Sequence, residues 1–440
     1  MVRRPLRIAT TEQLERSARE AGYDVYLLPA LPSLDFNRSI QDRSSDGPIV
    51  RDFLESNDIE LVIDFNTGAL TFVPSMNDAA KTAITTSDLG IPYAAFYLDP
   101  ITSTMANVHW ADHWHVLENP TWVKCIPDRA HAEELRRLGV PQVVDMPMGA
   151  SNDDFDTSPP SAPDAGPAVA FMGHPASSWF RSNQPILPAR LFAGLTAAAT
   201  HADMPDVPFH KMYYDLHEFA SPPVADDDRG ARATKALSYF NEKFLFNAYL
   251  AVKQRDRFAR FLKLKLGDAF ELVGDHWQTN YGLSHTPRIW DMKLLHDRMR
   301  HVPISLNLTK GNFESGLNIR HFEITAYGGF MLTYAMPETN ELFVPGEECD
   351  VFTSEEDLLQ KISFYLQNPA RRREIAAAGQ RRTLREHLYS HRIERLVAIL
   401  RQSGLLARLG PVEASIKGSA TVRTAPLRGF PVAVPAGVAP

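Results

Sequence analysis

The sequence is poor in cysteine: Cys125 and Cys349 are the only two in 440 residues. They lie far apart and belong to no Cys-x-x-Cys or Cys/His pattern. This excludes a disulfide framework and fits a reducing compartment. We therefore expect a cytoplasmic protein.

The sequence also lacks a basic surplus and a long hydrophobic run. Lys and Arg number 46 against 53 Asp and Glu, a net charge of −7. Nucleic-acid binders need positive charge to neutralise phosphates, so nucleic acid is disfavoured as a partner. No segment approaches the ~18 apolar residues of a membrane span. The two arginines near the N-terminus are not followed by the apolar run of a signal peptide.

What the sequence does contain is the pattern of two α/β domains, the expected number at this length. Short apolar runs alternate with helical patterns in the first 150 residues. Strands of this kind indicate a parallel sheet covered by helices on both faces. The predicted strands are 7–10, 25–28, 61–65, 93–98, 115–119 and 143–148, and the predicted helices include 11–22 and 128–139.

A Pro-, Ser- and Asp-rich segment, residues 151–167, is typical of a linker and separates a first domain (1–150) from a second (168–388). A mostly helical insertion is predicted at about 185–266. Further strands are predicted at 168–173, 270–277, 301–308, 328–334 and 349–354, with helices at 318–327, 355–367, 369–387 and 392–402. The C-terminal helix, within 389–410, could pack back on the first domain, and residues 411–440 predict a disordered tail.

The segment from 305 to 333 carries the chemistry. A buried strand ends in a polar loop with Lys310, and a helix begins near Asn318. Gly316 and Asn318 suit a turn into a helix N-terminus, whose unpaired N–H groups and positive dipole end bind phosphates. The backbone of Gly316, Leu317 and Asn318 is therefore a candidate diphosphate cradle, and Lys310 would add positive charge.

Arg320 and Glu323 lie three residues apart and share one face of this helix. In the first turn, the Arg320 guanidinium can reach a phosphate in bidentate fashion. One turn further on, the Glu323 carboxylate can accept hydrogen bonds from two vicinal hydroxyls, such as those of a ribose. The same spacing also describes a plain surface ion pair worth ~0.2 to 0.5 kcal/mol, and spacing alone does not decide between the two.

The run from Gly316 onward resembles the C-terminal domain of CgeB-like glycosyltransferases, relatives of the retaining GT-B group. The shared pattern is Asn-x-Arg-x-Phe-Glu, then Gly-Gly, then a helix with Asn-Pro, then a histidine–aromatic pair. Its residues here are Asn318, Arg320, Phe322, Glu323, Gly328, Gly329, Asn368, Pro369, His387 and Tyr389. The resemblance covers roughly residues 267–400; a weaker likeness over 60–175 rests on FYLDP, VDMPMGA and FMG.

This resemblance implies a GT-B fold, in which two Rossmann-like domains face a cleft and a nucleoside diphosphate sugar binds the C-terminal one. It implies Glu323 on the ribose, the diphosphate on the amides of 316–318, retention of configuration, and no metal or other cofactor. Related enzymes often carry two glutamates eight positions apart, whereas here Ser315 stands eight before Glu323 and Glu314 is one residue out of register. The alternatives are a sugar-nucleotide epimerase or phosphorylase, or a non-catalytic GT-B structural or assembly protein.

Ends of strands supply further candidates, since ligands of parallel sheets bind beyond the carboxyl ends. In the first domain these are Asp99, which could orient an acceptor hydroxyl or simply form a turn, and the acceptor-side loop Asn66, Thr67 and Gly68. The acceptor itself, whether protein, polysaccharide, lipid-linked glycan or small molecule, stays open, as does a homo-oligomeric state.

In the second domain Gly173 and His174 end a strand, and His174 could donate to phosphates. The Arg-plus-Lys pair that often follows this strand in related enzymes is not evident, and Arg181 is the nearest candidate. Trp277 could stack on a nucleobase or be a buried aromatic. The cluster His109, Asp112, His113 and His115 has one helical His-x3-His spacing but no further ligand pattern, so no metal site is expected.

Overall fold

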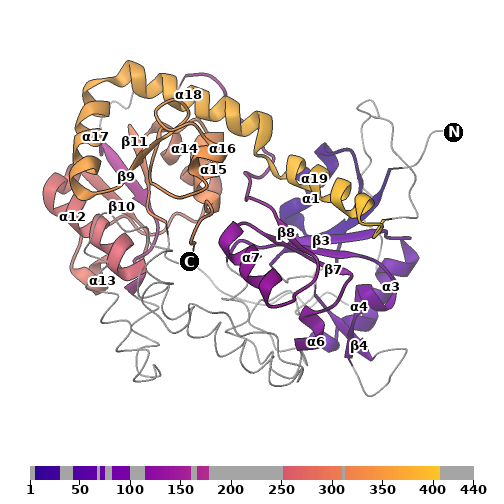
Figure 1. Cartoon of the computed structure of the whole chain (residues 1–440). Helices are drawn as coiled ribbons and strands as arrows, with labels where there is room; N and C mark the ends of the chain where they lie inside the picture. The colour runs from indigo at the N-terminus through magenta and orange to yellow at the C-terminus, as the bar shows by residue number, and fades with distance from the viewer. Residues whose placement is uncertain are drawn as a thin grey trace, which may run out of the picture.

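The computed structural model describes residues 5–29, 43–66, 70–74, 82–99, 114–159, 166–177, 251–309 and 313–406. Thr67, Gly68, Arg181, Lys310, His109, Asp112 and His113, most of the predicted insertion and the predicted tail lie outside these residues. Two α/β domains stand side by side, each built on its own parallel sheet (Figure 1). The prediction of two Rossmann-like domains is confirmed. No helix in the described ranges is long and apolar enough to cross a membrane.

The N-terminal domain has a six-stranded parallel sheet with the order β2-β1-β3-β6-β7-β8. Every residue of β3, β6 and β7 is buried, because helices cover both faces of the sheet. The strands are β1 Arg7–Thr10, β2 Asp24–Leu27, β3 Leu61–Phe65, β6 Tyr93–Phe96, β7 Trp122–Ile126 and β8 Val143–Asp145, and a small antiparallel pair is formed by β4 Phe72–Pro74 and β5 Thr82–Ile84.

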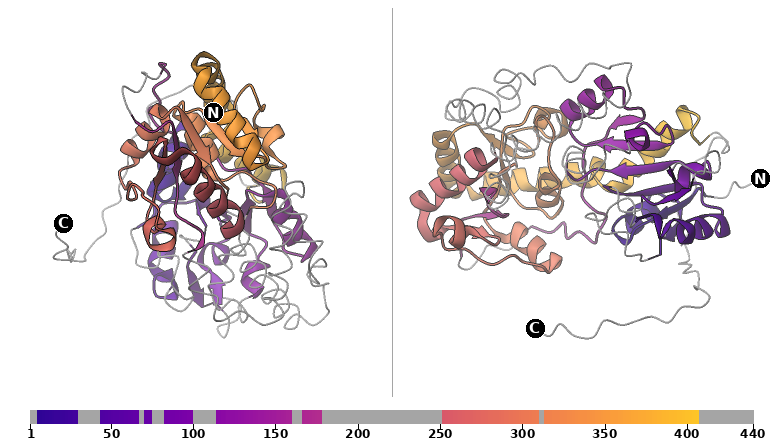
Figure 2. Two further views of the ribbon diagram at one scale, coloured as in Figure 1. Left: turned by 90° about the vertical axis from the view of Figure 1, so that its left-hand side faces the viewer. Right: turned by 90° about the horizontal axis from the view of Figure 1, so that it is seen from below.

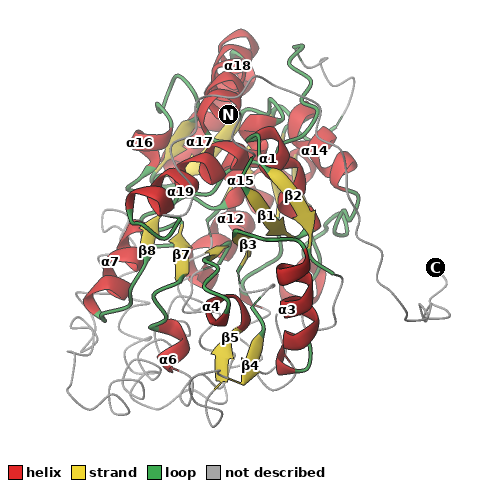
Figure 3. Cartoon of the chain, turned by 90° about the vertical axis from the view of Figure 1, so that its right-hand side faces the viewer, coloured by secondary structure: helices red, strands yellow, loops and turns green. Residues whose placement is uncertain are grey.

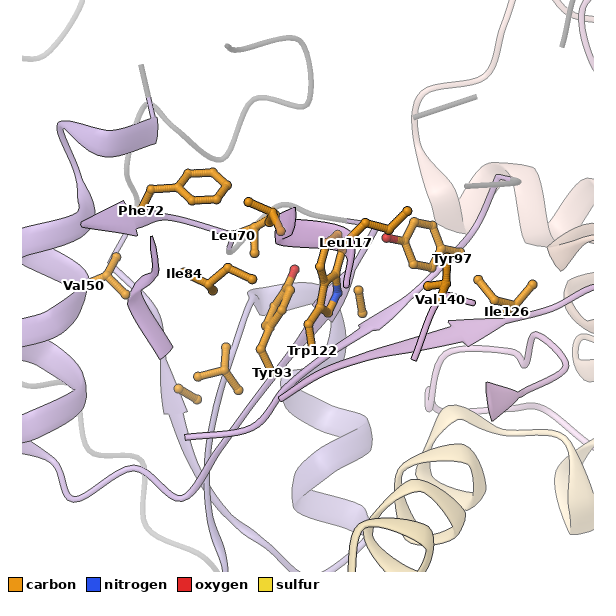
Figure 4. Close-up of a cluster of buried hydrophobic side chains, with 14 of the residues drawn as sticks. Val50, Leu70, Phe72, Ile84, Tyr93, Tyr97, Leu117, Trp122, Ile126 and Val140 are labelled. Carbon is orange, nitrogen blue, oxygen red and sulfur yellow. The ribbon is translucent and has the colours of Figure 1, made fainter. Parts of the chain in front are cut away.

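Two layers of helices enclose this sheet. The described helices are α1 Glu12–Glu20, α3 Gly47–Ser56, α4 Thr85–Asp88, α6 Trp114–Leu117 and α7 Arg129–Arg137. Side chains of α3, α6 and α7 pack on one face, around Tyr93 and Trp122 (Figure 4). The other face is covered by α1 together with α19 Tyr389–Gln402, the last described helix (Figure 3).

The strand predicted at 115–119 is wrong. The structure places helix α6 there and a buried strand, β7, a few residues later. The sequence conceals β7 because Lys124 interrupts its apolar run. The amine of Lys124 is nevertheless buried and donates to the carbonyls of Pro141 at 3.1 Å and Asn119 at 3.4 Å. Burial lowers the pKa of Lys124 well below its ordinary value, so this strand holds an ionisable residue inside the sheet.

The C-terminal domain has a five-stranded parallel sheet with the order β10-β9-β11-β12-β13. Its strands are β9 Val169–Met172, β10 Phe270–Val273, β11 Ile304–Asn307, β12 Met331–Tyr334 and β13 Asp350–Phe352. Its helices are α12 Arg257–Leu266, α13 Trp277–Tyr281, α14 Met292–His301, α15 Ile319–Ala326, α16 Thr339–Leu342, α17 Glu355–Gln367 and α18 Pro369–Glu386, with a π-helical turn at Val252–Asp256 before α12 and a 3₁₀ turn at Gly267–Ala269 after it. α12 and α17 pack on one face, α14 and α15 on the other.

The chain crosses between the domains twice, and the crossings lie side by side. Ala150 pairs with Leu388 in a parallel bridge, and the Tyr389 N–H donates to the Ala150 carbonyl at 2.9 Å. α18 leads up to this bridge from the C-terminal domain, and α19 continues from it onto the N-terminal domain (Figures 1 and 2). The Tyr389 ring meets Phe65 and Phe96 edge-on, at 4.9 and 5.8 Å between centroids. The end of the chain thus completes the core of the first domain.

Residues 151–159, the first part of the predicted linker, lie against both domains. The Arg300 guanidinium donates to the carbonyls of Asp156 and Ser158, the latter at 2.6 Å. Asn152 exchanges hydrogen bonds with Ser390, at 3.0 Å in each direction. Proline and serine composition therefore conceals a segment with specific tertiary contacts.

Candidate functional site

The carboxyl ends of β9 and β10 meet at two glycines. The Gly274 backbone has φ +149°, and a Cβ there would lie 2.6 Å from the Gly173 carbonyl oxygen, so only glycine permits this approach. The indole N–H of Trp277 donates to the same carbonyl at 2.9 Å. Trp277 is completely buried against Phe171. Its predicted stacking on a nucleobase is wrong, because the indole supports the end of β9 from inside the core.

His174 follows Gly173 at this strand end. Its Nδ1 accepts the backbone N–H of Asp275 at 2.9 Å, which places the ring proton of a neutral imidazole on Nε2. Partial burial lowers the pKa of His174 below its usual value, and repulsion from Arg288 and Arg255 contributes in the same direction. His174 is thus a neutral hydrogen-bond donor at the end of β9.

The sequence analysis missed Arg255, which lies in the π-helical turn before α12. Its guanidinium carbon lies 4.8 Å from the centroid of the Phe171 ring. Its Nη2 fills the space beside Gly173, so that a Cβ on Gly173 would overlap it. π-Helical turns recur at functional sites. No sequence spacing connects Arg255 with Gly173, because 82 positions separate them (255 − 173).

Arg255 is a buried cation that lacks a carboxylate partner among the described residues. Its exposed fraction is 7%, and its Nε has no hydrogen-bond partner. The neighbouring carboxylate, Asp256, instead accepts from the N–H groups of Ala176 and Ser177 and from the Tyr281 hydroxyl, at 2.8, 3.0 and 2.7 Å. Desolvation lowers the pKa of Arg255 to about 10. A buried unpaired charge is costly and points to a binding site for an anion.

Arg320 lies close enough to Arg255 for its positive charge to lower the pKa of Arg255 further. Arg320 Nη1 forms an ion pair with Glu323 at 2.8 Å, and the two side chains are 25% and 15% exposed. Glu323 Oε2 nevertheless has no well-directed hydrogen bond. The ion pair between Arg320 and Glu323 that the spacing predicts therefore forms. In the folded protein this pair lies near the buried Arg255.

One amide of the predicted diphosphate cradle at 316–318 is already occupied, and the side chains of the other two residues point into the protein. The Gly316 N–H donates to the Asp128 carboxylate of the N-terminal domain at 3.1 Å, so this amide already holds an anion. The Leu317 side chain is buried in the core. The Asn318 Oδ1 accepts from Asn307 at 3.2 Å and contacts His321 Nδ1 at 2.9 Å, so this side chain faces the interior of its domain.

On the acceptor side, Asn66 and Asp99 follow β3 and β6. Asn66 has φ +55°, and its Oδ1 accepts the Leu98 N–H at 2.9 Å, which ties the two strand ends together. Asp99 is half-buried directly after this contact. Asn66 thus has a structural task in addition to its predicted place beside the acceptor. In the described part of the chain, no group of three His, Cys, Asp or Glu side chains is arranged to hold a metal ion.

Residues 254–398 match the model of a family described as glycosyl transferase-like. The match includes Arg255, Arg320 and Glu323, so the stretch that carries these residues is similar to glycosyl transferase-like domains. No curated protein sequence matches the chain. Parallel sheets in two facing domains, with a C-terminal helix that returns to the first, give the chain the GT-B architecture.

Among solved structures, the chain is similar to sucrose-phosphate synthase from Thermosynechococcus elongatus, with 13% identity, 91% of this chain and 99% of that one covered, and a TM-score of 0.46. The UDP-forming α,α-trehalose-phosphate synthase from Burkholderia vietnamiensis shows 12% identity, coverage of 91% and 100%, and a TM-score of 0.46. Anabaena HepE in complex with UDP and glucose shows 11% identity, coverage of 90% and 100%, and a TM-score of 0.44.

Proposed function

We propose that this protein transfers a glycosyl group from a nucleoside diphosphate sugar to an acceptor hydroxyl, with retention of configuration and without a bound metal. The donor diphosphate binds at the carboxyl ends of β9 and β10, between Arg255, Arg320 and His174. The family match over residues 254–398 supports sugar transfer as the class of reaction.

The observation that carries this proposal is the buried guanidinium of Arg255, which forms no ion pair with any carboxylate in the described part of the chain. A bound diphosphate would supply the ion-pair partner that Arg255 lacks among the described residues. Arg320 adds a second positive charge, and Nε2–H of His174 adds a neutral donor. An arginine can hold two phosphate oxygens at once, which suits a diphosphate better than a single carboxylate.

The same charges serve the chemical step. The bond between the anomeric carbon and the diphosphate oxygen breaks, a bond to the acceptor oxygen forms, and the acceptor proton ends on the released diphosphate. Negative charge accumulates on the leaving diphosphate during this step. Fixed cations in a site with little water stabilise that charge most effectively. Glu323, held beside Arg320, is the proposed partner of the donor ribose, and Asp99 that of the acceptor hydroxyl.

The test is a calorimetric titration of the wild-type protein with UDP, GDP, ADP, CDP and dTDP, with and without Mg²⁺. We expect one diphosphate to bind selectively and metal-independently, and Arg255→Met to abolish that binding. Arg257→Met is the matched control, because Arg257 is exposed and paired with Glu355 at 2.9 Å. Binding that survives in Arg255→Met would remove Arg255 from the site.

A second candidate, a protein that binds the nucleotide sugar without transferring it, is favoured by Ser315. The resemblance places a glutamate at this position, but Ser315 Oγ donates to Asp128 at 2.9 Å and contacts Glu338 at 2.6 Å. Donor that is bound but never consumed across a broad panel of acceptors would support this candidate. Release of diphosphate that depends on one acceptor supports transfer.

A further inference from the structure

A carboxylate of the N-terminal domain fills an anion-binding nest in the C-terminal one. Oδ2 of Asp128 accepts the backbone N–H groups of Glu314, Ser315 and Gly316, at 2.7, 2.9 and 3.1 Å. Oδ1 accepts the Ser315 hydroxyl at 2.9 Å and, as the N-cap of α7, the N–H of His131 at 3.2 Å. Successive amides that converge on one oxygen bind anions well. Here the anion belongs to the protein.

Around Asp128 lies a wider set of polar contacts between the domains, which we call the domain latch: residues 128–131 with residues 314–316, Glu338 and Glu341. The Arg129 N–H donates to Glu338 at 3.0 Å, and its guanidinium holds both carboxylate oxygens of Glu341 at 2.9 and 2.5 Å. His131 Nε2 lies 3.1 Å from Glu314 Oε1, with both residues 1% exposed. The latch therefore contains a buried centre and an exposed rim.

The backbone is shaped for this contact. A Cβ on Gly316 would lie 2.9 Å from the Asp128 Cα and would overlap the Pro127 carbonyl oxygen. Only glycine lets the two loops come this close. Burial by itself would raise the pKa of Asp128, but His131 and the three amides hold it at about 2, so the carboxylate is ionised at neutral pH.

The loop that Asp128 holds leads directly into α15. Gly316 stands two residues before Asn318, the N-cap of that helix, and Arg320 and Glu323 lie in its first two turns. We propose that Asp128 is a positioning residue: it fixes the 314–316 loop and thereby sets the placement of Arg320 and Glu323 relative to the N-terminal domain. In this way a residue of the N-terminal, acceptor-side domain would hold the donor-binding residues of the C-terminal domain in place.

The contact between Asp128 and the 314–316 loop does not depend on what the protein does, whereas the effect of this contact on nucleotide binding rests on the proposed function. Hydrogen–deuterium exchange of the wild-type protein tests this contact without any variant or ligand. We expect the amides of Glu314, Ser315 and Gly316 to exchange slowly, since each is bonded to a buried carboxylate. Exchange as fast as that of an exposed loop would overturn the proposal.

Asp128→Asn tests the coupling, because asparagine has the same size and still caps α7 but lacks the charge. Asp58→Asn is the matched control, since Asp58 pairs with Arg7 at 2.9 Å on the same domain and belongs to no contact of the latch. We expect Asp128→Asn to speed exchange at 314–316 and to raise the Kd of the nucleoside diphosphate that the wild type binds most tightly by at least about 10-fold, as small misplacements of binding groups do.

A merely structural role of Asp128 would lower the melting temperature and leave that Kd within about twofold of the control, which would overturn the proposal. Asp128→Ser, which also retains a helix cap, repeats the test should the asparagine variant not fold. If no diphosphate binds the wild type, the proposed function fails. The exchange measurement still decides whether the latch exists.

Discussion

The guanidinium of Arg255 lies over the Phe171 ring, 4.8 Å from its centroid, at the end of the strand that opens the second domain. Among the described residues no carboxylate forms an ion pair with this guanidinium, although the nearby charge of Asp256 attracts it, so an incoming anion meets a cation that rests on an aromatic face.

Arg255→Met should stabilise the unliganded protein while it removes nucleotide binding. The low pKa of Arg255, about 10 against an ordinary 12.5, corresponds to a burial penalty on the order of 1 to 3 kcal/mol, which a methionine of similar length does not carry. Thermal or denaturant unfolding without ligand measures this gain. A variant less stable than wild type would show that Arg255 has a structural partner and is not held ready for an anion.

Gly173→Ala should displace Arg255 and weaken nucleotide binding, although residue 173 contributes no side-chain group itself. The added methyl would overlap Arg255 Nη2 and lie 2.8 Å from the Phe171 ring. We expect a loss in affinity of about tenfold or more, measured by titration with the preferred diphosphate. Gly282→Ala is a useful comparison: it stands at φ +67°, with nothing near its Cβ, and should lower stability alone.

Glu323→Gln separates the two interpretations of the Arg320 pair. If Glu323 binds the donor ribose, the KM for the nucleotide sugar rises by roughly 10-fold, because a charge-assisted hydrogen bond is worth about 1.5 kcal/mol or more. If the pair is only intrahelical, stability falls by about 0.5 kcal/mol and KM does not change. Steady-state kinetics together with a melting curve distinguish these outcomes.

Asp128 should make the protein less stable in acid. Its folded-state pKa of about 2 lies below the ordinary 3.8, so its contribution, about 2 kcal/mol, is present above pH 3.8 and is lost as the pH falls towards 2. The charged groups that face it are His131, Glu314 and Glu338. Burial raises the pKa of Glu338 in the folded protein. The stability that Glu338 contributes is therefore lost as the pH rises through its raised folded-state pKa.

Denaturant unfolding of wild type and Asp128→Asn between pH 6 and pH 2 measures this effect. The stability difference between the two proteins should shrink by about 2 kcal/mol over the acidic part of the range. A difference that stays constant across the range would mean that the Asp128 carboxylate is not specially stabilised in the folded protein.

The sequence by itself determined most of the elements and the class of fold. Buried strands such as Leu61–Phe65, and helices such as Glu355–Gln367 with its Ser354 cap, follow from local apolar pattern and capping chemistry. The local pattern gave the wrong prediction at Lys124, because an ionisable side chain in an apolar run hides the buried strand β7. The sequence also singled out His174, which follows a strand, and Arg320 and Glu323, which share one face in the first two turns of a helix.

The tertiary structure alone decided which groups meet. Arg255 reaches Gly173, 82 positions away in the sequence, and Asp128 reaches Gly316, 188 positions away. Neither contact has a sequence period, because both depend on how loops at the ends of separately formed sheets and helices are packed together. The tertiary structure likewise removed Trp277 from the candidate site, since an indole that fills a core looks in sequence like one that stacks on a base.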